Sequence, residues 1–279
     1  MNATRILIAS ILILALVIGT SAYFVVEATR SQTAATAPAA KPAAATTVEG
    51  TDEATGEATG EAVRNYLLEN PEIIETALMA LQAKRAEQAK AERSHIITQM
   101  QDQIFNSPNQ MVLGNPEGEI TLVEFFDYNC GYCKRAFPDM VALIESNPDL
   151  RMVMKEFPIL SEGSLEAARI AVAVHTVAPE RYVDFHKEMM TRNGQADRAK
   201  AMQVVQDLDL DAAAVEREAA ADAVDQHLSE VQAIAGALDI SGTPSYVIGD
   251  QAVPGAVGFD QLQQMIIAAR KCGGESLTC

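Results

Sequence analysis

The two residues best suited to chemistry are Cys130 and Cys133, which are separated by Gly131 and Tyr132. They come just after the apolar run 120–126, which predicts a buried strand, and they open a helical pattern. At the start of a helix the backbone N–H groups are unpaired and the dipole is positive, which stabilises a thiolate at Cys130. A thiolate attacks disulfides, and Cys133, one turn further along, is placed to resolve the mixed disulfide that results. The spacing therefore predicts thiol–disulfide exchange, with Gly131 and Tyr132 next to the substrate.

Two other uses of this pair are open, half of a zinc site or an inert structural disulfide. Zinc needs two further ligands, but Cys272 and Cys279 are separated by six residues. The histidines form no ligand-spaced pair near any cysteine; they are His95, His175, His186 and His227. A disulfide across two residues adds little stability, because the loop that it closes is tiny. We therefore expect no metal, and no cofactor beyond the redox-active disulfide itself.

The N-terminus carries a segment that indicates the compartment. Residues Ile6–Val26 contain no charge, and a helix of that length, about 31 Å, matches a bilayer core of roughly 30 Å. Arg5 precedes the segment, so the N-terminus should stay in the cytoplasm while the remainder is exported. We expect residues 1–27 to be a signal anchor on the inner membrane, with the protein in the periplasm; a cleaved secretory signal peptide is the alternative. In either case the cysteines lie where disulfides persist.

The rest of the chain divides by composition. Its 279 residues carry a formal net charge of −17, which excludes nucleic acid as a partner because like charges repel. Residues 28–60 are rich in Ala, Thr, Gly and Glu and predict a disordered linker. Residues 61–107 predict helices with a short apolar stripe that needs a partner, either the main domain or other copies of the chain. The main domain is expected over residues 108–279.

The main domain alternates strands and helices. The apolar run 150–157 predicts a second strand after the helix that begins at Cys130. Residues 164–238 predict helices with breaks at Pro179, Asn193-Gly194 and near Asp209, within an insert over residues 162–240. A hairpin (245–254) and a last helix (259–272) follow. This order predicts an α/β, thioredoxin-like fold with an inserted helical domain. The N-terminal helical segment and the membrane-spanning or signal helix precede it.

Two motifs resemble the DsbA/DsbG-type periplasmic thioredoxin superfamily. One is the run Phe125–Lys134, Phe-Phe-Asp-Tyr-Asn-Cys-Gly-Tyr-Cys-Lys, and the other is Gly-Thr-Pro at residues 242–244, followed by Tyr-Val-Ile-Gly. In that family the proline is cis and faces the redox pair, so the resemblance implies that Thr243 and Pro244 hold the substrate. The backbone of Thr243 would pair with an extended peptide like an added strand. An ordinary trans turn is the alternative.

Two further residues take roles from this resemblance. Glu124 is an acid in an otherwise apolar strand, where a charge is costly. The family carries an acid there to relay protons near the buried cysteine, which implies a catalytic Glu124 with a raised pKa; a partly exposed strand-end carboxylate is the alternative. A tyrosine at position 132 is typical of isomerases and reductases, because strong oxidants carry a histidine that stabilises the thiolate.

The remaining cysteines, Cys272 and Cys279, bracket six residues at the C-terminus. In an oxidising compartment we expect them to form a structural disulfide. A redox or metal-binding pair on a flexible tail is the alternative.

Residues 61–107 also resemble the N-terminal segment of the copper-sensitivity-suppressor (ScsC-type) branch of the superfamily. The matching run is Tyr-Leu-Leu-Glu-Asn-Pro-Glu-Ile-Ile at residues 66–74, followed by Ala77 and Leu78. In that branch the segment oligomerises the protein, as a trimer in some members. The resemblance therefore implies a homo-oligomer formed through residues 61–107.

These observations lead to three hypotheses. The first is a periplasmic disulfide isomerase or reductase that acts on exported client proteins with cysteines and is kept reduced by a membrane redox partner. The second is a DsbA-like disulfide oxidase. The third, from another class, is a copper-binding or chaperone module for metal tolerance. The eleven methionines suit Cu(I), but they are scattered and predict core filling.

Overall fold

The computed structural model describes residues 53–108 and 110–279, in two units that divide between Pro71 and Glu72. The predicted anchor or signal helix, residues 1–27, lies outside the described residues, as does most of the predicted linker. Within the described part of the chain, no helix combines the length and the apolar character needed to cross a bilayer.

The first unit contains helix α2, Glu53–Glu69. Residues 53–60 are therefore helical, and the prediction of disorder over residues 28–60 is wrong for this part. Alanine and glutamate are good helix formers and offset the cost of Gly56 and Gly60. After the helix, the side chain of Asn70 donates a hydrogen bond of 2.9 Å to the carbonyl oxygen of Tyr66. The backbone N–H of Asn70 donates to the same oxygen (2.9 Å), so this carbonyl at the helix end accepts two hydrogen bonds.

The second unit opens with helix α3, Glu72–Gln99, and the short helix α4, Gln101–Phe105. Helix α3 continues without a break through residues 82–92, all of which are exposed. Its end and α4 instead pack on the main domain, because Ile97 and Ile104 are buried in one of its two cores. The structure thus divides the chain at residues 71–72, whereas the sequence predicted a division at 107–108.

A mixed five-stranded sheet forms the centre of the second unit, in the order β1-β3-β2-β4-β5. Strands β2 and β3 are parallel and the other neighbours are antiparallel. The strands are β1 Met111–Gly114, β2 Ile120–Phe126, β3 Leu150–Glu156, β4 Ser245–Ile248 and β5 Gln251–Pro254. The sheet and its helices make the α/β, thioredoxin-like fold that the sequence predicted.

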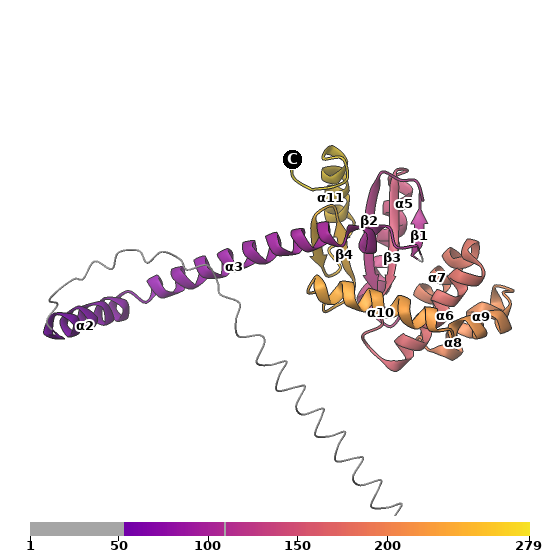
Figure 1. The fold of residues 1–279 in the computed structure, drawn as a ribbon, viewed down its shortest axis with the longest axis horizontal. Coiled ribbons are helices and arrows are strands. Elements are labelled where there is room, and N and C mark those ends of the chain that lie inside the picture. Colours follow the sequence, from indigo (N-terminus) through magenta and orange to yellow (C-terminus); the bar gives the residue numbers. More distant parts are fainter. Residues whose placement is uncertain (1–52, 109) are drawn as a thin grey trace, which may run out of the picture. The chain divides into compact units, whose positions relative to one another are not determined.

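Helices cover both faces of this sheet (Figure 1). Helices α5, Gly131–Ser146, and α11, Phe259–Lys271, pack on one face. The ends of α3 and α10 and helix α4 pack on the other. Because side chains alternate along a strand, Leu122 and Phe126 of β2 join the first core, whereas Val123 and Phe125 join the second. The central strand is therefore buried on both faces.

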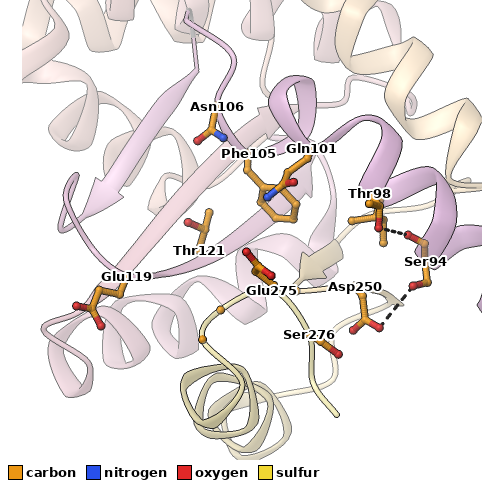
Figure 2. Close-up of a pocket in the computed structure, with 14 residues that line it drawn as sticks. Ser94, Thr98, Gln101, Phe105, Asn106, Glu119, Thr121, Asp250, Glu275 and Ser276 are labelled. Atoms are coloured by element: carbon orange, nitrogen blue, oxygen red, sulfur yellow. Dashed lines mark hydrogen bonds between the residues drawn. The ribbon is translucent and has the colours of Figure 1, made fainter. Parts of the chain in front are cut away.

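The C-terminal tail folds back after α11 against the turn between β4 and β5. Cys272 and Cys279 are joined by a disulfide. Asp250 in the turn accepts hydrogen bonds from the backbone N–H of Leu277 (3.1 Å) and from Oγ of Ser94 in α3 (3.5 Å). Figure 2 shows Ser94 and Asp250 beside a cavity of about 550 Å³, which the tail residues Glu275 and Ser276 also line.

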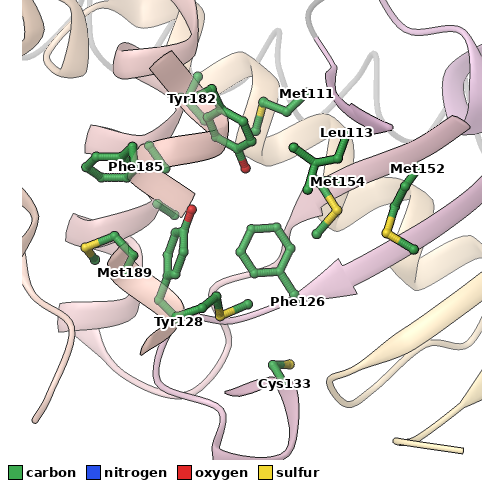
Figure 3. Close-up of a cluster of buried hydrophobic side chains, with 14 of the residues drawn as sticks. Met111, Leu113, Phe126, Tyr128, Cys133, Met152, Met154, Tyr182, Phe185 and Met189 are labelled. Atoms are coloured by element: carbon green, nitrogen blue, oxygen red, sulfur yellow. The ribbon is translucent and has the colours of Figure 1, made fainter. Parts of the chain in front are cut away.

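The segment between β3 and β4 forms the inserted helical domain. It comprises α6 Glu162–Val177, a 3-10 turn Pro179–Arg181, α7 Tyr182–Thr191, α8 Arg198–Asp207, α9 Ala212–Ala219 and α10 Asp222–Ala237. Tyr182 and Met189 of α7 pack with Phe126, Tyr128 and Met154 from the sheet side (Figure 3). These methionines are fully buried, as the core-filling prediction expected.

Candidate active site

The predicted nucleophile lies where strand β2 gives way to helix α5. Cys130 is the residue just before the helix and has an extended backbone conformation. Its N–H donates to the carbonyl oxygen of Asp127 (2.9 Å), and its own carbonyl accepts the N–H of Lys134 (3.1 Å). Cys130 is thus the N-terminal cap residue of α5, next to the first helical turn, whose backbone N–H groups have no partner within the helix.

The structure brings both predicted motifs to one place. Cys130 and Cys133 are free thiols, and both are buried. The Sγ atom of Cys130 donates a hydrogen bond of 3.1 Å to the carbonyl oxygen of Thr243, and the peptide bond between Thr243 and Pro244 is cis. The proline loop therefore faces the redox pair.

Glu124 lies in β2 between Met154 of β3 and Tyr246 of β4 and is only 3% exposed. Burial raises its pKa from 4.5 to about 8. Burial also raises the pKa of the Cys133 thiol, and the negative charge of Glu124 raises it further. The carboxyl group is thus a buried neighbour of the second cysteine, and a partly exposed strand-end position is excluded.

Tyr132 has the opposite environment, since it is 62% exposed. The guanidinium carbon of Arg135 lies 4.2 Å from the centroid of the Tyr132 ring, in cation–π geometry. Gly131 next to it is also exposed. Both spacer residues are therefore exposed to solvent, and their contact with substrate stays a prediction.

Space for a bound chain lies next to the proline loop. A cavity of about 350 Å³ is bordered by Thr243 and Pro244, by strand β5 and by Arg93 of α3. Its wall includes the polar residues Asp239 and Ser241. The cavity thus extends from the proline loop along strand β5 to the end of α3.

Sequence reasoning missed three residues that hold the loop before Cys130. Asp127 accepts hydrogen bonds from the backbone N–H groups of Ile159 and Leu160, and the hydroxyl of Tyr128 lies 3.1 Å from Nδ1 of His186. Asn129 bonds to the helical insert through both atoms of its amide. The positions of Asp127 and Asn129 could have indicated this role, because Asp and Asn beside a helix start favour hydrogen bonds from the side chain to the backbone.

A comparison with models of protein families identifies the family of this chain. The model of the DSBA-like thioredoxin domain matches residues 121–266, which hold both cysteines, Glu124 and the proline loop. The chain belongs to this DsbA-like family. A second model, the copper resistance protein ScsC N-terminal domain, matches residues 57–88, which lie in α2 and α3.

Solved structures of similar chains support the assignment. A thioredoxin-like oxidoreductase from Silicibacter pomeroyi is 42% identical, with 61% of this chain and 97% of that chain covered and a TM-score of 0.59. ScsC from Proteus mirabilis in a transitional conformation is 29% identical, with 81% and 99% covered and a TM-score of 0.58. BcfH from Salmonella enterica Typhimurium is 29% identical, with 80% and 97% covered and a TM-score of 0.67.

Curated relatives match over a shorter part of the chain. The match covers 24% of the Na(+)/H(+) antiporter NhaA 1 of Salinispora arenicola, at 23% identity. It covers 75% of disulfide bond formation protein D of Bacillus subtilis, at 22% identity. Family membership confirms the prediction of a DsbA-like thiol–disulfide oxidoreductase, and the substrates and partners of the whole protein stay proposals.

The second cysteine pair of this DsbA-like protein is separate from the first. The Cys272–Cys279 tail borders the cavity beside Glu119 at the beginning of β2, whereas Cys130 follows the end of that strand. Within residues 53–108 and 110–279, no group of three His, Cys, Asp or Glu side chains is arranged to hold a metal.

Proposed function

We propose that this DsbA-like chain is a periplasmic disulfide isomerase or reductase that acts on exported proteins with cysteines. The observation that carries the proposal is the position of the cysteine pair at the start of α5, with Sγ of Cys130 3.1 Å from the carbonyl oxygen of Thr243. In that position Sγ of Cys130 can attack a substrate whose backbone pairs with that of Thr243. The proposed location agrees with the periplasmic thioredoxin-like protein of Salmonella enterica that is 27% identical to this chain.

The proposed reaction begins when the Cys130 thiolate attacks one sulfur of a client disulfide. A bond forms between Cys130 and the client, and the other client sulfur leaves as a thiolate that takes up a proton. If that client thiol attacks a second client disulfide, the thiolate that it displaces attacks the client sulfur bound to Cys130, which forms a new client disulfide and releases the Cys130 thiolate. If Cys133 gives its proton to ionised Glu124 and attacks Cys130, the client leaves reduced and the enzyme keeps the Cys130–Cys133 disulfide. A membrane redox partner then restores the dithiol.

Two features favour isomerase or reductase over oxidase activity. The spacer holds Tyr132 where strong oxidants hold histidine, so less stabilisation of the thiolate is available. Helix α3 also leaves an apolar stripe in water, since Ile74 is 47% and Leu78 is 53% exposed. We propose that copies of residues 61–107 cover this stripe in a homo-oligomer, with a trimer as the form to test, which places several active sites around one client.

The experiment combines a redox measurement with a repair assay. The equilibrium of the Cys130–Cys133 couple with glutathione gives the reduction potential, and a client with scrambled disulfides reports isomerase activity. Ile74→Glu with Leu78→Glu should give monomers that exchange dithiols normally but repair the scrambled client several-fold more slowly. Ala83→Glu, on the opposite side of the exposed part of α3, is the matched control. A strongly oxidising potential without repair activity would favour the oxidase.

A second variant separates the oxidoreductase from a copper-binding or chaperone module. Cys133→Ala removes the resolving thiol, so mixed disulfides between Cys130 and client proteins should accumulate on non-reducing gels. Additional Cys130→Ala should abolish them. A metal module would trap no client and would lose Cu(I) affinity instead.

A further inference from the structure

Each of the three residues of the redox loop between β2 and Cys130 bonds to the helical insert or to the segment that leads into it. Asp127 Oδ2 accepts the N–H groups of Ile159 (3.0 Å) and Leu160 (3.1 Å), just before the insert begins. The Tyr128 hydroxyl meets His186 of helix α7. Several separate hydrogen bonds therefore hold the loop in place.

Asn129, the residue next to the nucleophile, makes the most specific of these contacts. Its Nδ2 donates to the carbonyl oxygen of Ala196 (2.8 Å), while its Oδ1 accepts the N–H of the same residue (2.7 Å). Ala196 is fully buried, in the segment before helix α8. Because one face of the amide donates and the other accepts, this two-way pairing suits asparagine and not aspartate or alanine.

The same amide also reaches the beginning of helix α6. Nδ2 of Asn129 lies 3.0 Å from Oγ of Ser164 and 3.4 Å from Oγ of Ser161, the residue that caps α6. One side chain thus connects two segments of the insert that are more than thirty residues apart in sequence. Contacts of this kind fix the direction in which the chain enters α5.

We propose that Asn129 is a positioning residue, which sets the reactivity of Cys130 by fixing the redox loop to the helical insert. The inference rests on the proposed thiol–disulfide exchange and adds a role for the insert in it. Stabilisation of an anion by a helix falls off within the first turn, so a small displacement of the Cys130 backbone removes much of it. Loss of the Asn129 contacts therefore favours the protonated thiol and makes the couple more reducing.

The test uses the full chain with Asn129→Ala and, as a second variant, Asn129→Asp, which keeps the acceptor for Ala196 but loses the donor. Reaction of Cys130 with iodoacetamide, read by mass spectrometry, and the equilibrium with glutathione are measured. We expect Asn129→Ala to slow alkylation about tenfold and to shift the equilibrium constant about tenfold, which equals about 30 mV for a two-electron couple. Asn129→Asp should change the alkylation rate and the equilibrium constant in the same direction as Asn129→Ala.

The matched control is Asn147→Ala at the other end of α5. Asn147 is buried, whereas Asn129 is half-buried, and like Asn129 it bonds through its side-chain amide, to the backbone of Leu143 (2.9 Å) and to Gln263 (2.8 Å). Its loss should lower the melting temperature while leaving alkylation and potential at wild-type values. The proposal is overturned if folded Asn129 variants keep wild-type values, or if Asn147→Ala shifts them equally. Failure of the wild-type protein to repair disulfides would instead count against the proposed function alone.

Discussion

Glu124 and Cys133 are buried neighbours whose charged forms repel each other. The ionised carboxylate raises the pKa of the Cys133 thiol, in addition to the larger effect of burial. Burial alone raises the pKa of Glu124 to about 8. At neutral pH the carboxyl group is therefore largely protonated, and it becomes a proton acceptor for Cys133 only when it ionises.

The first prediction concerns the pH dependence of stability. The folded-state pKa of Glu124, about 8, lies above the unfolded value near 4.5. The stability that protonated Glu124 contributes to the folded state is therefore fully present below pH 4.5 and is lost as pH rises towards 8. Glu124→Gln should therefore gain stability relative to wild type across this range, by up to roughly 1.4 kcal/mol for each pH unit. Urea denaturation at several pH values, with the cysteines kept reduced, measures the difference.

Exposed Glu117 offers the control for this experiment, because its side chain is not buried and Glu117→Gln should lack the gain in stability that Glu124→Gln shows as pH rises. Parallel curves for Glu124→Gln and wild type would show that Glu124 ionises normally, and its proposed part in proton transfer would fail.

The second prediction concerns the spacer between the cysteines. Tyr132→His should make the couple more oxidising, because a histidine beside the first cysteine stabilises the thiolate. We expect the equilibrium constant with glutathione to change about tenfold, which is about 30 mV. The exposure of Tyr132 means that the fold should tolerate the change.

Tyr132→Phe is the matched control, since a phenylalanine keeps the ring beneath Arg135 and adds no titratable nitrogen. Its potential should equal that of wild type. An equal shift in both variants would assign the effect to the lost hydroxyl and contradict the electrostatic argument.

Much of the fold could be predicted from local patterns in the sequence. The apolar run of β2, the helix after Cys130 and the hairpin across Gly249 each carry their own signal. The cysteine pair and Glu124 could be found because each breaks a local pattern, two thiols at a helix start and an acid in an apolar strand.

Other parts depend on contacts between distant segments. Lys155 and Glu156 end strand β3 as charged residues, a type that usually lies in solvent, yet both are buried. Lys155 donates to the carbonyl oxygen of Gln103, and Glu156 accepts from the hydroxyl of Tyr182. The partners come from α4 and the insert, so nothing in the strand itself predicts them. The pairing of Asn129 with Ala196 is hidden for the same reason.

The last prediction concerns the C-terminal disulfide, whose cysteines are seven positions apart. A loop of that size should contribute roughly 2 kcal/mol to the free energy of unfolding. The tail also supplies the Leu277 N–H to Asp250, which in turn accepts from Ser94 of α3 (Figure 2). Cys272→Ala with Cys279→Ala should therefore lower stability by about that amount in urea denaturation, with dithiol exchange by Cys130 and Cys133 unchanged.

Thr278→Ala, which keeps the disulfide, is the control. A several-fold loss of dithiol exchange in the double variant, but not in Thr278→Ala, would identify the tail as a second redox pair. A purely structural cross-link should not affect exchange, because it lies beside the beginning of β2 whereas Cys130 and Cys133 lie beyond the end of that strand.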